Sequence, residues 1–241
     1  MRVHFVVHES FEAPGVFETW AMNRGHEVTF SRVYMGQKLP ENARNIDLLI
    51  VMGGPQDPSV TVEECSHFNS RAEQALIASA VHSGKAVVGV CLGAQLIGEA
   101  LDAPFDHSPE KEIGKFPIFM TDAGRANEMF SHFGNVLEVG HWHNDMPGLT
   151  PDAEVIAWSD GCPRQIVAYS GLVYGFQCHM ELTPAVVELL ISHTDGDVSR
   201  AAEYRFVQSA DALRGNNYTE MNRVLFTFLD KLEYRCRQSG L

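Results

Sequence analysis

The first hundred residues alternate between short apolar runs and longer stretches with helical periodicity. The apolar runs, which predict buried strands, cover residues 3–7, 28–33, 47–52 and 86–90. The segments 16–25, 68–83 and 93–100 between them place apolar residues on one face and predict helices. Because strands and helices alternate and the strands are apolar throughout, we expect a doubly wound, mostly parallel sheet flanked by helices.

The second half of the chain has a different pattern. Short runs rich in β-branched and aromatic residues lie at 116–120, 136–139, 154–158, 165–169 and 172–176, with turn residues between them. These runs predict strands that complete the sheet and form a small antiparallel flank. Near the end, residues 218–232 predict an amphipathic helix that packs on the sheet, with Asn217 and Glu220 spaced as a cap pair.

Length and charge limit the classes of protein that need considering. A chain of 241 residues can form one large α/β domain, and we expect residues 1–241 to be a single domain. The formal net charge of −13 argues against binding to nucleic acid or anionic lipid. No apolar run is long enough to span a bilayer and the N-terminus lacks the zones of a signal peptide, so we expect a cytoplasmic protein.

The five cysteines show no CxxC spacing, which favours neither a disulfide framework nor a zinc site. One of them lies where a predicted strand meets a predicted helix, in the run Gly89-Val90-Cys91-Leu92-Gly93. Glycines two positions on either side of a nucleophile allow a strained strand-to-helix turn. The helix N-terminus would then favour thiolate, and Leu92 N–H could donate to an oxyanion. The alternative is a buried structural cysteine.

A thiolate that cleaves an amide needs a group to protonate the leaving amine, and His179 lies at the end of another predicted strand. Glu181 follows two residues later, a spacing that puts both side chains on one side of an extended segment. We therefore predict a triad of Cys91, His179 and Glu181. Gly53 and Gly54, which end the strand at 47–52, could supply further oxyanion N–H groups, although by themselves they also suit a tight turn.

These segments, in this order, resemble the class I glutamine amidotransferases over about residues 45–185, and most closely the glutaminase domain of GMP synthase. The shared runs are Gly53-Gly54-Pro55, the segment from Gly89 to Gln95, and Cys178-His179-Met180-Glu181. Residues 8–15 and 111–114 are also similar. The resemblance implies a flavodoxin-like fold, a C-terminal helical extension at about 184–241, and hydrolysis of the glutamine side-chain amide through a cysteine thioester. Met180 departs from the family, in which many members have proline.

The resemblance also implies substrate contacts by Gln95 and by a segment that contains His143, Asn144 and Asp145. Asn144 replaces a glycine of the family pattern. A rival interpretation is metal binding, since His141, His143 and Asp145 alternate onto one face of a strand. A polar strand end near the pocket is a further alternative. We expect no metal and no cofactor.

Three functions remain open at this point. The first is a glutaminase or amidotransferase subunit that passes ammonia to a separate synthase, because the sequence contains no phosphate-binding loop for activating an acceptor. The second is a γ-glutamyl peptidase or hydrolase that uses the same triad on another γ-glutamyl small molecule. The third is a non-catalytic regulatory binding protein of the same fold. The C-terminal extension could cap the domain or support a homodimer.

Overall fold

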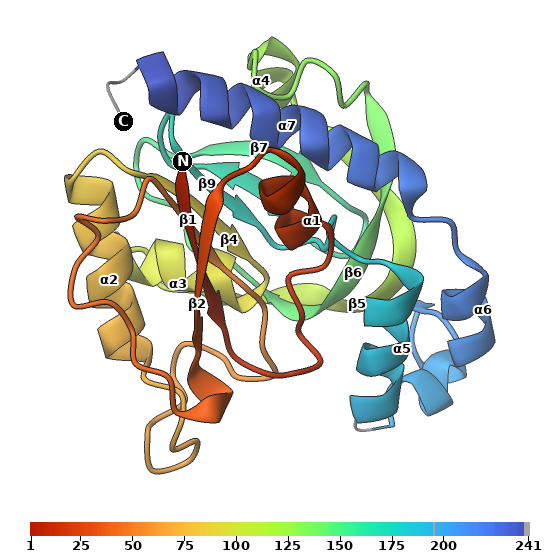
Figure 1. Cartoon of the computed structure of the whole chain (residues 1–241). Helices are drawn as coiled ribbons and strands as arrows, with labels where there is room; N and C mark the ends of the chain where they lie inside the picture. The colour runs from red at the N-terminus through yellow and green to blue at the C-terminus, as the bar shows by residue number, and fades with distance from the viewer. Residues whose placement is uncertain (195, 239–241) are drawn as a thin grey trace.

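One sheet of ten strands forms the centre of the protein (Figure 1), as the computed structural model describes it for residues 1–194 and 196–238. The strands are β1 (Arg2–Val7), β2 (Glu27–Arg32), β3 (Leu48–Val51), β4 (Ala86–Val90), β5 (Asp106–Met120), β6 (Val136–Met146), β7 (Glu154–Trp158), β8 (Ile166–Ala168), β9 (Val173–Phe176) and β10 (Phe206–Val207). Their order is β10-β5-β7-β8-β9-β4-β3-β1-β2, and β6 pairs with β5.

The strands β2, β1, β3, β4 and β9 are parallel, and the β5–β6, β5–β7, β7–β8 and β8–β9 pairs are antiparallel. This arrangement confirms the predicted mostly parallel sheet with an antiparallel flank. Successive side chains alternate between two buried clusters, so that Phe5 and Ile50 belong to one and Val6 and Leu49 to the other. The central strands are therefore apolar on both faces.

Helices cover both faces of the sheet (Figure 1). They are α1 (Val16–Asn23), α2 (Ser70–His82), α3 (Leu92–Ala100), α4 (Asp122–Ala126), α5 (Pro184–His193), α6 (Ala210–Gly215) and α7 (Thr219–Gln238), with 3₁₀ turns at Val33–Met35 and Val198–Glu203. Apolar residues of α2 and α3 pack in one cluster, and those of α1, α5, α6 and α7 pack in the other. No helix among the described residues is long and apolar enough to cross a membrane.

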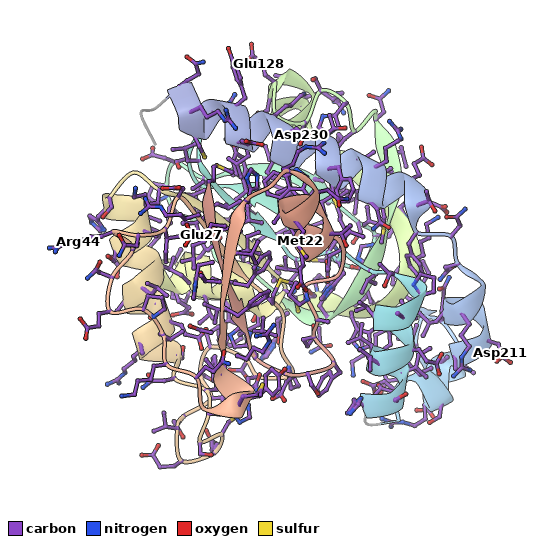
Figure 2. The ribbon with its side chains drawn as sticks, in the orientation of Figure 1. Met22, Glu27, Arg44, Glu128, Asp211 and Asp230 are labelled. Carbon is purple, nitrogen blue, oxygen red and sulfur yellow. The ribbon has the colours of Figure 1, made fainter. Side chains whose placement is uncertain are left out.

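The long helix α7 lies across α1 on one face of the sheet. Trp20 Nε1 donates to Asp230 Oδ1 at 2.8 Å, and Arg24 forms an ion pair with the same carboxylate at 2.7 Å; Figure 2 labels Asp230 on α7 above α1. At the start of α7, Asn217 Oδ1 accepts from Thr219 N at 2.9 Å. Asn217 thus binds the first residue of the helix, and its predicted pairing with Glu220 stays a prediction.

The hairpin of β5 and β6 is much longer than predicted. Residues 106–115 and 140–146 also belong to these strands, although their sequences are rich in charged and polar residues. The hairpin pairs Glu112 with His143 and Gly114 with His141, with a register shift between His107 and Glu112. Because these parts of the hairpin are polar, they show no alternation of apolar and polar positions. The sequence therefore predicts only the apolar ends of the two strands.

Candidate active site

Cys91 occupies the sharp turn between β4 and α3. Its φ is 51°, a left-handed conformation that is rare for residues other than glycine. A Cβ atom at Gly93 would lie 2.0 Å from Val51 O, and one at Gly89 would lie 2.3 Å from Gly93 O. Both glycines are therefore needed for α3 to start this close to the sheet. The thiol is at the N-terminus of α3, and Sγ lies 3.7 Å from Trp142 O.

His179 and Glu181 form a buried pair in the segment after β9. Nδ1 of His179 donates to Glu181 Oε1 at 2.7 Å, and His179 N donates to Gly140 O of β6 at 2.8 Å. Nε2 is buried and makes no well-directed hydrogen bond with any described residue. Burial alone would lower the pKa of His179, but the Glu181 carboxylate and the nearby Cys91 side chain raise it well above its ordinary value. The raised pKa favours the protonated form of the ring beside the Cys91 side chain.

The loop that contains Gly53 and Gly54 is held by a second buried histidine. His8 Nδ1 donates to Gly53 O at 2.9 Å, and Nε2 donates to Glu73 Oε2 at 2.7 Å. Burial opposes protonation of His8, yet Glu73 raises its pKa. Because the peptide is trans, fixing Gly53 O turns Gly54 N–H away from His8. A Cβ atom at Gly54 would lie 2.9 Å from Leu92 Cδ2, so the two predicted oxyanion segments are adjacent.

A cavity of about 230 Å³ opens next to the thiol. Its lining includes six of the residues predicted from the sequence: Cys91, Gly54, Gln95, His143, Asn144 and Asp145. Gln95 Nε2 donates to Gln177 Oε1 at 3.3 Å, whereas its own Oε1 has no partner in the described part of the chain. Gly53, Leu92, His179 and Glu181 are not among the lining residues, and His179 and Glu181 are buried.

Glu12 also lines the cavity, and the residue patterns did not single it out. It is buried, and a Cβ atom at Gly53 would lie 2.6 Å from Glu12 Oε2 and 3.2 Å from His179 Cε1. Burial raises the pKa of this carboxyl, with His179 acting in the opposite direction and Glu181 in the same one. Only the family resemblance pointed to the segment 8–15. A single glutamate in a loop has no periodicity from which its burial could be predicted.

The alternation of His141, His143 and Asp145 brings only the two histidines together. Their facing nitrogens are 3.4 Å apart, and the carboxylate beside them is that of Glu112 on β5. Asp145 instead accepts from His107 Nδ1 at 2.6 Å. Burial lowers the pKa of His141 to about 4. Burial opposes ionisation of Glu112, but the hydrogen bond from His143 and the charge of His141 lower its pKa.

Comparison with known proteins identifies a family for this chain. A family described as Glutamine amidotransferase class-I matches residues 19–190. The chain belongs to this family. It is 56% identical, over 96% of its length and 97% of the relative, to the glutamine amidotransferase-like protein YfeJ of Salmonella typhimurium.

Two further comparisons place this chain among its relatives. The crystal structure of SMU.1228c is similar with a TM-score of 0.95 and 47% identity, covering 97% of this chain and 100% of that one. One component of a glutamine-hydrolysing GMP synthase from Methanococcus maripaludis is 28% identical over 66% of this chain and 74% of its own length. Class I members hydrolyse glutamine in general, and these likenesses confirm the predicted family.

Proposed function

We propose that this chain hydrolyses the side-chain amide of glutamine, with Cys91 as nucleophile, His179 as acid and base, and Glu181 as the group that orients His179. The observation that carries the proposal is the cysteine at φ 51° on a helix N-terminus, beside an imidazole held by a carboxylate at 2.7 Å. Such a set provides a nucleophile, a proton carrier and an orienting group.

In the first half of the reaction, His179 holds the proton of the Cys91 thiol, Sγ attacks the amide carbon and the carbonyl oxygen becomes an oxyanion. Gly54 N–H and Leu92 N–H, with the Gly53 peptide held by His8, would stabilise that charge. The C–N bond then breaks, His179 gives its proton to the leaving nitrogen, and ammonia departs. In the second half, His179 takes a proton from water, which attacks the thioester and releases glutamate and the thiol.

The cavity supports a small substrate. Its volume of about 230 Å³ is below the roughly 300–1,000 Å³ of sites for drug-sized ligands. Gln95, whose Oε1 is unpartnered in the described part of the chain, together with Asn144, Asp145 and the backbone of His143, would bind the polar groups of glutamine. A γ-glutamyl peptide has a second amine-bearing part, for which a cavity of this size leaves less room.

We further propose that the ammonia passes to a separate synthase. The relative from Methanococcus maripaludis is named as one subunit of GMP synthase, and this chain has no phosphate-binding loop of its own. The partner would therefore carry the ATP-dependent step.

The test is glutamate release by the purified protein from glutamine and, in parallel, from γ-glutamyl peptides. We expect glutamine to be the better substrate and Cys91→Ala to lose at least about 10³-fold in kcat. Preference for peptides would assign a γ-glutamyl peptidase instead. Activity that survives in Cys91→Ala would refute the proposed nucleophile, and no release from either substrate would favour a regulatory binding protein.

A further inference from the structure

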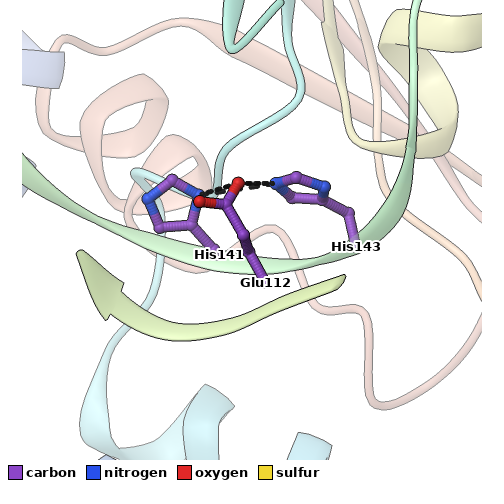
Figure 3. Close-up of side chains that lie close together, drawn as sticks. All are labelled: Glu112, His141 and His143. Atoms are coloured by element: carbon purple, nitrogen blue, oxygen red, sulfur yellow. Dashed lines mark hydrogen bonds and ion pairs between the residues drawn. The ribbon is translucent and has the colours of Figure 1, made fainter. Parts of the chain in front are cut away.

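We propose that Glu112, His141 and His143 form a zinc-binding site behind the cavity, separate from the Cys91 triad. The three side chains come from the two strands of the β5–β6 hairpin, are all buried, and point toward one another (Figure 3). The proposal stands independently of the glutaminase activity.

The spacing of the three ligand atoms favours a tetrahedral ion. Glu112 Oε2 lies 3.3 Å from His143 Nε2 and 3.6 Å from His141 Nδ1, and the two nitrogens are 3.4 Å apart. In tetrahedral zinc sites with bonds of about 2.0–2.1 Å, neighbouring ligand atoms lie about 3.3–3.4 Å apart. The ligands of an octahedral ion with the same bond length lie about 2.9 Å apart. The observed triangle therefore fits zinc better than magnesium.

The orientation of His141 leaves a lone pair facing the centre of this triangle. His141 Nε2 contacts the carbonyl of Phe116 at 3.2 Å, and because a carbonyl only accepts, Nε2 carries the hydrogen. In the neutral ring, Nδ1 then has a bare lone pair directed at the Glu112 carboxylate. Two acceptors that face each other without a hydrogen between them repel, and a cation between them removes that repulsion. A backbone carbonyl on the second nitrogen is also the usual partner of a metal-bound histidine.

Neighbouring residues hold the carboxylate in place. Ser159 Oγ lies 2.8 and 2.9 Å from the two oxygens of Glu112, and Gln165 Nε2 donates to Oε2 at 2.6 Å. A Cβ atom at Gly161 would lie 2.7 Å from Glu112 Cδ, so this glycine lets the β7–β8 connection close over the carboxylate. Across residues 1–194 and 196–238, the ion-pair partners of Glu112 are the two imidazoles. A cation bound between these groups would balance the charge of the buried carboxylate.

Three protein ligands leave a fourth position for water or for Gln165, whose amide nitrogen lies 3.1 Å from His143 Nε2 and whose Oε1 has no partner among the described residues. Zinc is the ion that this donor set of two imidazoles and one carboxylate suits. Bound there, it would tie β5 to β6 on either side of Trp142, whose carbonyl lies 3.7 Å from Cys91 Sγ. The ion would therefore stiffen the wall of the cavity without touching the reacting atoms.

The experiment measures metal bound by the full chain after it is stripped with a chelator, exposed to Zn²⁺ and desalted. We expect about one zinc per chain in the wild type and in His107→Gln, a matched control that removes an exposed histidine of the same hairpin. Glu112→Gln and His141→Gln should lose the zinc, with affinity lowered at least about 100-fold. A wild type that retains no zinc would overturn the proposal.

Two further measurements on the wild type require neither catalytic activity nor a variant that folds. In the wild type, Co²⁺ should give the intense visible absorption of a tetrahedral site without the charge-transfer band of a cobalt–thiolate bond. A thiolate band would place the metal on a cysteine such as Cys91 and refute the site. Zinc should also raise the unfolding temperature of the wild type. An unfolding temperature that zinc does not change would contradict the proposed site as well.

Discussion

The side chains proposed to carry the reaction depend on backbone geometry that their neighbours enforce. A residue other than glycine at positive φ costs about 1–3 kcal/mol, and it persists only where the surroundings hold it. Cys91 N donates to Phe176 O at 2.7 Å, while its carbonyl accepts from Ala94 N in the first turn of α3. The proposed nucleophile is thus held between β9 and the start of α3.

We expect Glu181→Gln to lower kcat at least about 100-fold, because the amide neither fixes the ring of His179 nor stabilises its positive charge. The carboxylate contributes to the raised pKa of His179, so its loss lets the imidazolium deprotonate at lower pH. The alkaline limb of the pH–rate profile should therefore move to lower pH. An alkaline limb that stays in place would mean that His179 is not the group being titrated.

Contiguous residues of the candidate site could be predicted, and residues that come from distant strands could not. Cys91 and the pair of His179 and Glu181 lie at strand ends with short, readable spacings. Glu112 meets the two histidines through cross-strand pairing in the β5–β6 hairpin, where it lies opposite His143, and no spacing in the sequence encodes that register. For the same reason the alternation of the sequence associates Asp145, and not Glu112, with the two histidines.

Among the elements, α7 has the clearest effect on the candidate site. Asn222 Nδ2 donates to Met180 O at 2.8 Å and to Leu182 O at 3.1 Å, the carbonyls on both sides of Glu181. Met221 of the same helix accepts at Sδ from Gly140 N, next to the backbone bond that holds His179. The helix lies beyond residues 19–190, where the family matches, yet it braces the loop that carries His179 and Glu181.

We predict that Asn222→Ala lowers kcat about 10-fold and leaves two buried carbonyls with weaker partners, at a stability cost of about 1–3 kcal/mol. The matched control is Asn217→Ala, which removes the bond to Thr219 N at the start of the helix. The control substitution should lower the free energy of unfolding by about 1 kcal/mol and keep kcat near the wild-type value. Equal kcat in both variants, measured by glutamate release at a temperature where both are folded, would contradict the bracing role.

At the scale of the whole molecule, the sheet is covered on both faces, and a few of its buried groups are polar. His4 on β1 contacts Thr29 Oγ1 at 2.8 Å and Ser31 Oγ at 3.0 Å on β2. Burial lowers its pKa to about 4, and burial does the same for His141. Both histidines are therefore neutral in the folded protein at pH values where the unfolded chain takes up protons.

The contribution of His4 to the free energy of unfolding should consequently fall as the pH drops from about 6.5 to about 4. In that window the unfolded chain protonates this histidine and the folded protein does not, so its contribution rises with pH and is complete above the unfolded pKa. In His4→Gln, the slope should be shallower by up to about 1.4 kcal/mol per pH unit. Urea unfolding at several pH values measures the slope, and an unchanged slope would mean that His4 is protonated in the fold.

The fold class was predictable because apolar strands and amphipathic helices alternate through the first hundred residues. The antiparallel flank was predictable in kind, but not in length, because residues 106–115 are polar and acquire their strand conformation from pairing with β6. The extension was expected to be helical, and α5, α6 and α7 lie within it. Residue 195 and residues 239–241, which belong to the predicted extension, lie outside the described residues.

The brace provided by Asn222 has a consequence for synthesis of the protein. A ribosome releases the chain from its N-terminus, so Cys91 and His179 emerge before α7 does. Until α7 docks, the carbonyls beside Glu181 lack their donor and the loop is held less firmly. On the proposed function, a growing chain exposes its thiol before it gains full hydrolytic capacity, and it reaches that capacity only after the last helix has emerged and docked.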